Sequence, residues 1–458
     1  MIIGIENIVF LIVAALGIGL FVWQIRKIRK NVLMGRDVEL SDNPSERINK
    51  TLLVAFGQQK MFKRMLPAVL HLFVYVGFLV INIEVLEILI DGIFGTHRIL
   101  GFAGILYSGL MFINEILAAL VIIACVIFLW RRNVTKVPRL AAGVEMRAWP
   151  KLDANLILIT EIVLMIALFA FNISDLKLAQ LRGTHIAGVY PVSSMFVDIL
   201  GSDPDNLYVI GRVGWWFHIL GILAFMNYLP SSKHFHIIMA FPNVYYSKLL
   251  PKGKFTTNAA ITHEIKAMLD PSYQPPAPEV DAEGNPVMQR FGAKDVEDLT
   301  WKQLMDSYTC TECGRCTSVC PANITGKLLS PRKIVMDTRD RMEEKGEHPA
   351  IFKPNHYKEM GVERVDTTEE KTLLRGYITP EELWACTSCN ACVESCPVNI
   401  DQLSTIMDLR RYLVLEESAA PASLNAMFTN IENNGAPWAF SPADRFNWAD
   451  ELYVPSKN

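Results

Sequence analysis

The chain has 458 residues, of which 51% are hydrophobic, and a formal net charge of −3. Its length suffices for two or three domains. Nucleic-acid binding requires a concentrated basic face, so this slightly acidic composition argues against nucleic acid as a partner. The apolar residues concentrate before about residue 240, and the remainder has the composition of a soluble domain.

Five apolar stretches in the first half are long enough, at roughly 17–25 residues, to cross a bilayer as helices. The first lacks the basic n-region and small-residue cleavage site of a signal peptide, so we interpret it as a retained anchor. Cys125, in the third stretch, is expected to be a buried small side chain without chemistry. The predicted spans are Ile8–Ile25, Leu66–Ile90, Ala103–Trp130, Asn155–Phe171 and Val209–Pro230.

Clusters of lysine and arginine predict the topology. They follow the first and third spans and precede the second and fourth, as in "RKIRKNVLMGR" and "RRNVTK". By the positive-inside rule the N-terminus lies outside and these loops are cytoplasmic. The fifth span then delivers the C-terminal half to the cytoplasm, which predicts a multi-pass protein of the cytoplasmic membrane embedded in lipid.

Four regions follow from this pattern. Residues 1–245 form a membrane domain, and residues 246–295 form a linker with the proline-rich, acidic stretch "PSYQPPAPEVDAEGNP". Residues 296–417 form a soluble domain of short helices, and residues 418–458 form a tail that is a candidate partner-docking segment. The predicted fold class is all-α, with a five-helix transmembrane bundle and a cytoplasmic, ferredoxin-like two-cluster domain.

Two near-copies of one cysteine run, "TCTECGRCTSVCP" and "ACTSCNACVESCP", lie in the soluble domain. Each has the C-x2-C-x2-C-x3-C-P spacing of two-cluster ferredoxins, in which the fourth cysteine ligates the other cluster. Structural zinc sites, the alternative, usually have separated C-x2-C pairs. We therefore predict two electron-relaying [4Fe-4S] clusters. Carried over, cluster I is held by Cys310, Cys313, Cys316 and Cys396, and cluster II by Cys386, Cys389, Cys392 and Cys320.

Three histidines lie in or beside the spans, where polar groups are costly and are functional candidates. His218 and His236 are 18 residues apart and point the same way if the helix continues past Pro230. His234 would then point to nearly the opposite side. Histidines on facing helices suit bis-imidazole ligation of haem. Depth alone leaves open whether His71 pairs with His236 or His218, and each can instead hydrogen-bond within the bundle.

The segments "AVLHLFVYVGF" and "WWFHILGILAFMNYLPSSKHFH" make the membrane half resemble the cytochrome b gamma subunit of respiratory nitrate reductases. That resemblance implies two stacked haems b, each held by a histidine of span 2 and one of span 5. It assigns His71 and His236 to the inner haem and His218 to the outer haem. The outer haem's span-2 position falls near Ile81, which cannot ligate. One haem b is therefore expected, and a second requires a replacement such as His97 or His185.

The stretch "LWACTSCNACVESCPVNIDQLSTIMDLRRYLV" makes the soluble half similar to the C subunit of heterodisulfide reductases. The likeness extends to related subunits of glycerol-3-phosphate dehydrogenase and of membrane-bound electron-transfer-flavoprotein oxidoreductases. Such chains often carry, or associate with, cysteine-rich CCG domains that perform the terminal chemistry. This chain has no CCG motif and no G-x-G-x-x-G fingerprint. The resemblance implies a separate cytoplasmic catalytic subunit of CCG or flavoprotein type.

Quinone is the expected substrate in the lipid, and its protonation needs carboxylates or water access. Glu84 and Glu87 lie near the outer end of span 2, where they can simply meet water, whereas Glu115 is deeper in span 3 and is the preferred candidate. The sequence thus predicts the membrane subunit of a quinone-linked respiratory oxidoreductase. It would connect its partner to the quinone pool, and the sequence does not indicate the direction of electron flow. The alternatives are a membrane-anchored ferredoxin-like scaffold without haem or quinone chemistry, and a cluster-driven ion translocator.

Overall fold

The computed structural model describes residues 4–147, 149–251, 253–277, 284, 290–346, 371–450 and 452. The described part is helical and contains no β-strand, only two isolated bridges. The expected all-α class is therefore confirmed. The chain divides into two compact units, Met1–Phe255 with Asp295–Ile406, and Thr256–Lys294 with Met407–Asn458.

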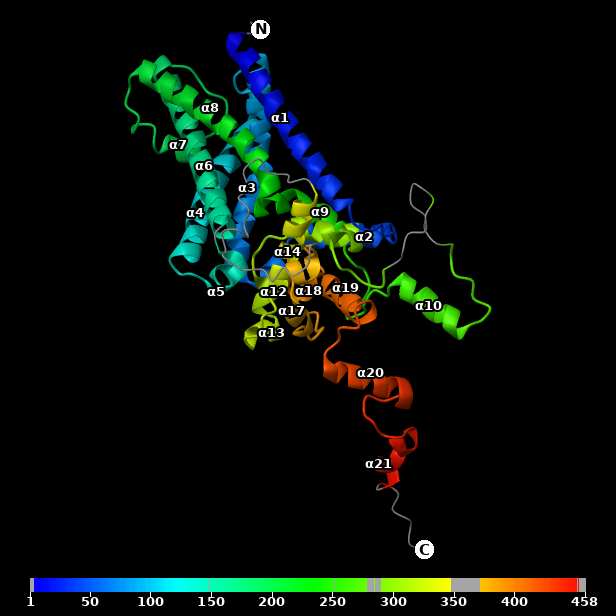
Figure 1. The fold of residues 1–458 in the computed structure, drawn as a ribbon. Helices are drawn as coiled ribbons and strands as arrows, with labels where there is room; N and C mark the ends of the chain where they lie inside the picture. Colours follow the sequence, from blue (N-terminus) through cyan, green and yellow to red (C-terminus); the bar gives the residue numbers. More distant parts are fainter. Residues whose placement is uncertain are drawn as a thin grey trace. The chain divides into compact units, whose positions relative to one another are not determined.

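Five long helices in the first unit are apolar enough and long enough to cross a membrane. Each contains the greater part of one predicted span and extends beyond it, because a helix satisfies its own backbone hydrogen bonds past the end of the apolar stretch. Figure 1 shows these helices running alongside one another. They are α1 (Ile5–Val32), α3 (Met65–Phe94), α4 (Ile105–Asn133), α6 (Trp149–Arg182) and α8 (Pro204–Tyr228).

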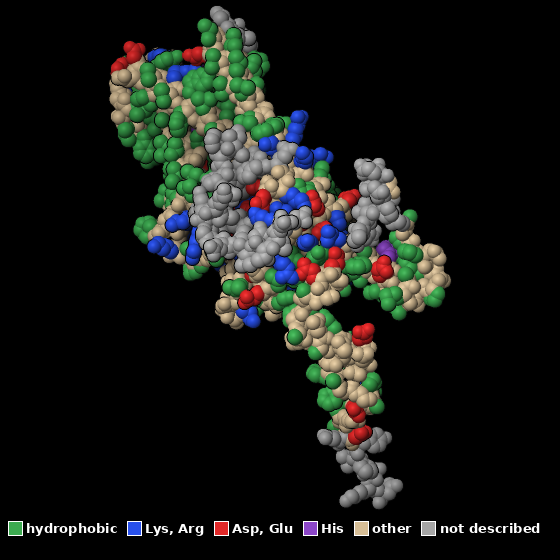
Figure 2. All heavy atoms as spheres, in the orientation of Figure 1, with side chains coloured by type: hydrophobic (Ala, Val, Ile, Leu, Met, Phe, Trp, Pro, Cys, Tyr) green, Lys and Arg blue, Asp and Glu red, His purple; other side chains and the backbone are tan. Residues whose placement is uncertain are grey.

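The bundle packs through apolar side chains on its inner faces and exposes others outward, as lipid contact requires. One interior cluster joins α3, α4 and α6 through Ile81, Leu117 and Leu168. Cys125 belongs to the same cluster and is fully buried, as expected. In Figure 2 hydrophobic side chains cover the bundle, while charged side chains gather over the cysteine-bearing part.

Short elements connect the long helices. They are α2 (Pro44–Thr51), the π-helix η1 (Leu52–Phe56), η2 (Met61–Lys63), η3 (Ile99–Ala103), α5 (Pro138–Ala141), η4 (Val144–Met146), α7 (Pro191–Ser194), η5 (Leu229–Ser231), η6 (Lys233–Phe235) and α9 (His236–Tyr245). The fifth span therefore ends before α9. The condition under which His218 and His236 would share a face, one helix continuing past Pro230, is therefore not met, and Ser232 is extended with φ −114° and ψ 153°.

The cysteine-bearing helices of the first unit lie at the end of the bundle where α1 finishes. Asn31 of α1 donates to the hydroxyl of Tyr308 at 3.0 Å, and Arg36 exchanges backbone hydrogen bonds with Leu299 and Trp301. The elements are η7 (Val296–Asp298), α11 (Trp301–Thr309), α12 (Arg315–Ser318), α13 (Pro321–Ile324), α14 (Pro331–Lys345), α16 (Leu373–Gly376), α17 (Pro380–Trp384), α18 (Ala391–Ser395) and the first part of α19 (Gln402–Leu415).

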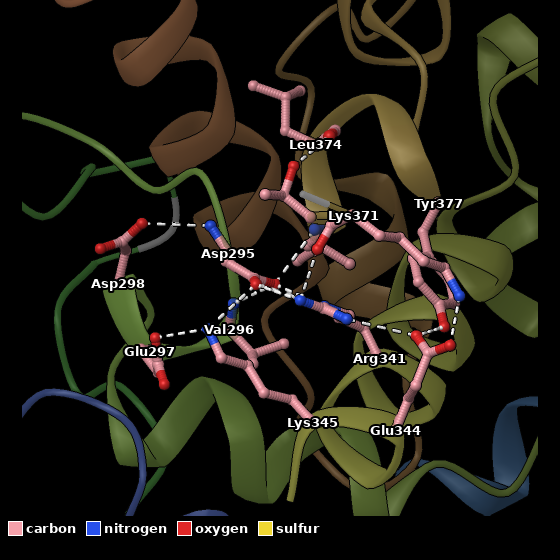
Figure 3. Close-up of polar contacts among 12 residues, drawn as sticks. Asp295, Val296, Glu297, Asp298, Arg341, Glu344, Lys345, Lys371, Leu374 and Tyr377 are labelled. Atoms are coloured by element: carbon pink, nitrogen blue, oxygen red, sulfur yellow. Dashed lines mark hydrogen bonds and ion pairs between the residues drawn. The ribbon is translucent and has the colours of Figure 1, made fainter. Parts of the chain in front are cut away.

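A buried ion pair fastens α14 to the start of this region (Figure 3). The guanidinium of Arg341 contacts the carboxylate of Asp295 at 2.7 Å, and Lys345 approaches the same carboxylate at 3.2 Å. The backbone N–H of Leu373 also donates to it, at 3.0 Å. Burial alone would raise the pKa of Asp295, but Arg341, the N–H of Val296 and Lys345 outweigh burial and lower it.

The second unit contains α10 (Ala259–Leu269), the second part of α19, α20 (Ala422–Asn434), η8 (Pro442–Phe446) and α21 (Asn447–Asp450). Helix α10 lies inside the expected linker and begins at Asn258, whose side chain accepts from the N–H of Ala260. The acidic part of that linker, residues 278–283 and 285–289, lies outside the described residues. Several aromatic side chains in the described part of the tail are exposed, among them Trp438, Phe440, Phe446 and Trp448.

Candidate electron-transfer centres

The two cysteine runs, 76 residues apart from Cys310 to Cys386, come together in space. Helix α12 lies inside the first run and packs against α18, which lies inside the second. Among the described residues no three His, Cys, Asp or Glu side chains converge in the way that a single metal ion requires.

Both runs fold with the same local turn. Glu312 (φ 52°) and Ser388 (φ 58°) have left-handed backbones, and each donates its N–H to the Sγ of the first cysteine of its run at 3.4 Å. Gly314 (φ 68°) and Asn390 (φ 60°) then precede the short helices. Repeated N–H donation toward sulfur favours the thiolate form, which is the form that binds iron.

The thiols of the two runs lie close enough to influence one another. Burial raises the pKa of Cys316 well above its usual range, and nearby Cys313 and Cys310 of its own run and Cys396 and Cys392 of the second run raise it further. Burial likewise raises the pKa of Cys392, with Cys386 and Cys320 adding to the effect. Such crowding disfavours ionised thiols unless positive charge neutralises them. Iron supplies that positive charge when it is bound.

The second run is more open to solvent than the first. Cys389 is exposed and Cys386 is half-buried, whereas Cys310 and Cys316 are buried. Cys310 packs with Cys396 and Val398 in one apolar cluster. The first run thus faces the protein interior, and the second provides the solvent-facing side of the pair.

The first run is held by the loops of the membrane domain that carry the basic clusters. Arg139 donates to the carbonyl oxygen of Cys313 at 2.6 Å, and Arg315 donates to the carbonyl oxygen of Lys60 at 2.9 Å. Further contacts join Lys63 to Glu394 and Arg64 to Ser318. The basic loops and the cysteine runs therefore share one end of the bundle, as the predicted topology requires.

A buried carboxylate lies between the first run and the membrane domain. Glu312 forms an ion pair with Lys233, and its other oxygen accepts from Arg339 at 3.0 Å. Glu312 is 4% exposed and Lys233 is 8% exposed. Burial alone would raise the pKa of Glu312, but the two cations hold it well below its usual range.

His71 of α3 and His236 at the start of α9 face each other, with ring centres 6.3 Å apart and ring planes inclined by 37°. Nδ1 of His236 lies 2.9 Å from the carbonyl oxygen of Lys233, so it carries the proton and leaves Nε2 free to ligate. Metal–nitrogen bonds of about 2 Å on both sides, plus roughly 1 Å to each ring centre, also give about 6 Å. The pair therefore fits an iron atom held between two imidazoles.

His234 lies in the same place, which the sequence reading missed. Its ring stacks on that of His236 at 5.8 Å and meets Phe225 at 5.3 Å. Burial lowers the pKa of His234 to about 3, and neighbouring His236 and His71 add to the effect. The signal was Pro230, because a proline inside an apparent helix often ends it and so changes which side chains share a face.

His218 is buried and separate from this group. Its Nδ1 lies 2.8 Å from the carbonyl oxygen of Leu164, and its Nε2 has no partner among the described residues. Ile81 lies in the apolar cluster that also contains Leu164. The two suggested replacements, His97 and His185, line a cavity whose lining does not include His218.

Glu115 is buried and bound on both oxygens. It accepts from the backbone N–H groups of Val192 and Ser193 at 2.8 and 2.9 Å, and from the side chains of Ser193 and Asn172. This arrangement fastens the α7 segment to α4. A carboxylate so occupied is suited to holding the loop in place.

A polar cavity of about 740 Å³ opens at the end of the bundle away from the cysteines. Glu84 and Glu87 line this cavity and are each 2% exposed. Glu87 accepts from the hydroxyl of Tyr107 at 2.8 Å. Glu84 accepts from Asn114 at 3.2 Å through one oxygen, and its other oxygen has no partner among the described residues.

Comparison with known proteins identifies the class of the soluble part. Two families, both described as "4Fe-4S dicluster domain", match residues 309–400 and 277–325. With five helices able to cross a membrane, the chain is a multi-pass membrane protein that carries an iron–sulfur dicluster domain for electron transfer.

Two relatives match most of the chain. "Probable iron-sulfur-binding oxidoreductase FadF" of Bacillus subtilis (strain 168) is 29% identical over 97% of this chain and 61% of its own length. "EtfAB:quinone oxidoreductase" of Syntrophomonas wolfei is 26% identical over 94% of this chain and 57% of its own length. The chain thus spans about 60% of these relatives. "Probable membrane-anchored ferredoxin" of Chromohalobacter salexigens is 37% identical over 36% of this chain and 25% of its own length. No solved structure matches.

Proposed function

We propose that the chain connects a cytoplasmic oxidoreductase to the quinone pool through two [4Fe-4S] clusters and at least one haem b. The observation that carries this proposal is the placement of the facing His71 and His236 rings beside the first cysteine run. Haem, when bound, supplies a one-electron carrier inside the membrane domain. The side chains of this chain orient it and connect it to the cysteines.

The ligand sets proposed for the clusters remain the crossed ones. Cluster I takes Cys310, Cys313, Cys316 and Cys396, and cluster II takes Cys386, Cys389, Cys392 and Cys320. The proximity of Cys396 to the first run and of Cys320 to Cys392 supports this assignment. The order of carriers is then partner, cluster II, cluster I and haem, because cluster II lies nearer to solvent and cluster I nearer to the histidines.

Quinone is proposed to react at the polar cavity, with Glu84 as the proton-carrying group. Its unpartnered oxygen and its burial support this choice over Glu115, whose oxygens are both occupied. A quinone link is also part of the name of the Syntrophomonas wolfei relative. His218 is retained as the ligand of a second haem if one is present.

The partner is proposed to be a separate catalytic subunit with a CCG domain or a flavin. The exposed thiol of Cys389 supports a partner. A relative from Methanosarcina mazei, 26% identical over 34% of this chain, is named as a subunit of a heterodisulfide reductase, which supports a multi-subunit arrangement. The positive-inside rule supports a cytoplasmic location for the partner and the clusters.

A membrane-anchored ferredoxin without haem is the second candidate, favoured by the name of the Chromohalobacter salexigens relative. The deciding experiment measures haem and non-haem iron per chain in detergent-purified protein, followed by haem reoxidation with a soluble quinone. About eight non-haem irons and one b-type haem, reoxidised by quinone, support the proposal. Full cluster content without haem would establish the second candidate.

A further inference from the structure

In the turn after the first cysteine, a charged side chain distinguishes the first cysteine run from the second. The turn after the first cysteine has the same backbone conformation in both runs, with Glu312 at one position and Ser388 at the other. Since serine forms this turn equally well, the geometry of the run does not require a carboxylate. Burying a carboxylate there costs free energy unless cations pair with it, which suggests another role.

One of the two cations that pair with Glu312 belongs to the segment that carries the histidines, and the other is Arg339 of α14. Lys233 forms an ion pair with Glu312 and also donates to the carbonyl oxygen of Pro150 on α6 at 2.6 Å. Asp153 lies 3.8 Å from the Lys233 ammonium and accepts from its backbone N–H at 3.1 Å. These contacts fix both the side chain and the backbone of Lys233 at the end of the membrane domain.

The same two residues join the sulfur and the imidazole through a continuous chain of contacts. The N–H of Glu312 points to Sγ of Cys310 at 3.4 Å. The carboxylate of Glu312 contacts the side-chain ammonium of Lys233. The backbone carbonyl oxygen of Lys233 accepts a hydrogen bond from Nδ1 of His236 at 2.9 Å. The contacts of Glu312 with Cys310 and Lys233 are buried and that of Lys233 with His236 is part-buried, so solvent screens these charges less than it would at the surface.

We propose that the Lys233–Glu312 ion pair is a positioning element that fixes the first cysteine run against His236 and sets the reduction potential of cluster I relative to the haem. This inference rests on the proposed function. Cluster potentials depend on net charge and hydrogen bonds around the sulfurs, and reduction adds negative charge. A nearby carboxylate therefore lowers the potential, and a nearby ammonium raises it.

The test is a redox titration of the detergent-purified protein, following both clusters by EPR and the haem by its optical spectrum. Glu312→Gln removes the carboxylate charge and is expected to raise the potential of cluster I. Lys233→Met removes the ammonium and is expected to lower it. Each change should shift the one-electron equilibrium with the haem about tenfold, which is about 59 mV. Lys233→Arg should restore the potential of the parent protein.

The matched control is Arg341→Met, which breaks another buried ion pair in the same unit. It should leave both cluster potentials unchanged. If Lys233→Met does not fold, Glu312→Gln alone decides, because Lys233 keeps Asp153 and Arg339 keeps Asp340 as carboxylate neighbours. Equal shifts of both clusters, or no shift beyond that of Arg341→Met, would overturn the inference. A parent protein with both clusters but no haem would instead refute the proposed function, and the cluster shifts would still test the ion pair.

Discussion

The imidazole of His236 is held by the carbonyl oxygen of Lys233, only three residues earlier, at 2.9 Å. The same carbonyl oxygen accepts from the backbone N–H of His236, in the 3-10 turn η6 that lies between α8 and α9. This turn places His236 at the first position of α9, with its ring turned toward His71 of α3.

The first prediction concerns these two histidines. Substitution of His71 or His236 by alanine removes one of the two proposed iron ligands, so either variant should lose the b-type haem. The cysteines lie on separate loops, and the cluster EPR signals should persist. The measurement is the reduced-minus-oxidised spectrum of the purified variant, with non-haem iron determined on the same sample.

His234→Ala is the matched control, because His234 stacks on His236 and is buried in the same place. It should keep its haem, with at most a small shift of the spectrum. If His234→Ala loses the haem and His236→Ala retains it, the ligand is His234 and our assignment is wrong.

Local patterns predicted much of this molecule. The apolar stretches revealed five long helices because length and composition suffice to recognise a span. The cysteine spacing marked the dicluster domain, since that spacing itself carries the chemistry. Local sequence patterns did not predict contacts between segments that are distant along the chain. Nothing in "TECG" shows that Glu312 meets Lys233, and nothing near Glu115 shows that the N–H groups of Val192 and Ser193 occupy it.

The crossed ligation gives the second prediction. Cys320 belongs to the first run in sequence but lies near Cys392 of the second. Cys320→Ser should therefore disturb the EPR signal of cluster II more than that of cluster I. Cys396→Ser, which alters the corresponding position of the other run, should do the reverse. Damage confined to the cluster of the same run in both variants would refute the crossing.

The third prediction separates the two buried glutamates. Glu84→Gln removes the carboxylate that lines the cavity with an unpartnered oxygen, and it should slow haem reoxidation by quinone at least tenfold. Proton transfer by a positioned group typically contributes about 10²–10⁴-fold, so the effect should be plain in stopped-flow traces. The haem content should not change.

Glu115→Gln serves as the comparison. A glutamine keeps one acceptor oxygen, but it presents donors where the N–H groups of Val192 and Ser193 now point. We expect lower thermal stability, by about 1–3 kcal/mol, with nearly normal quinone kinetics in the folded fraction. Slow reoxidation in Glu115→Gln and normal rates in Glu84→Gln would return the quinone role to Glu115.

The last prediction is a pH dependence of stability from the Asp295–Arg341 pair (Figure 3). The pKa of Asp295 is lowered in the folded protein, where Arg341, the N–H of Val296 and Lys345 outweigh the effect of burial. Its contribution is therefore fully present above the ordinary aspartate pKa of about 4. It is lost as the pH falls through the lower, folded value. Asp295→Asn should cost about 3 kcal/mol at pH 7, because Arg341 loses its buried partner.

The measurement is the thermal midpoint of helix loss by circular dichroism, for the parent protein and Asp295→Asn, from neutral pH to below pH 4. The difference between the two midpoints should be constant near neutrality and shrink in acid as the parent loses the same charge. The midpoint difference between the parent protein and Arg341→Met should have the same pH dependence. The double variant should lose less stability than the sum of the two single losses, since the two residues act as a pair. A difference that stays constant down to the lowest pH would show that Asp295 stabilises the fold through its shape and hydrogen bonds, and not through its charge.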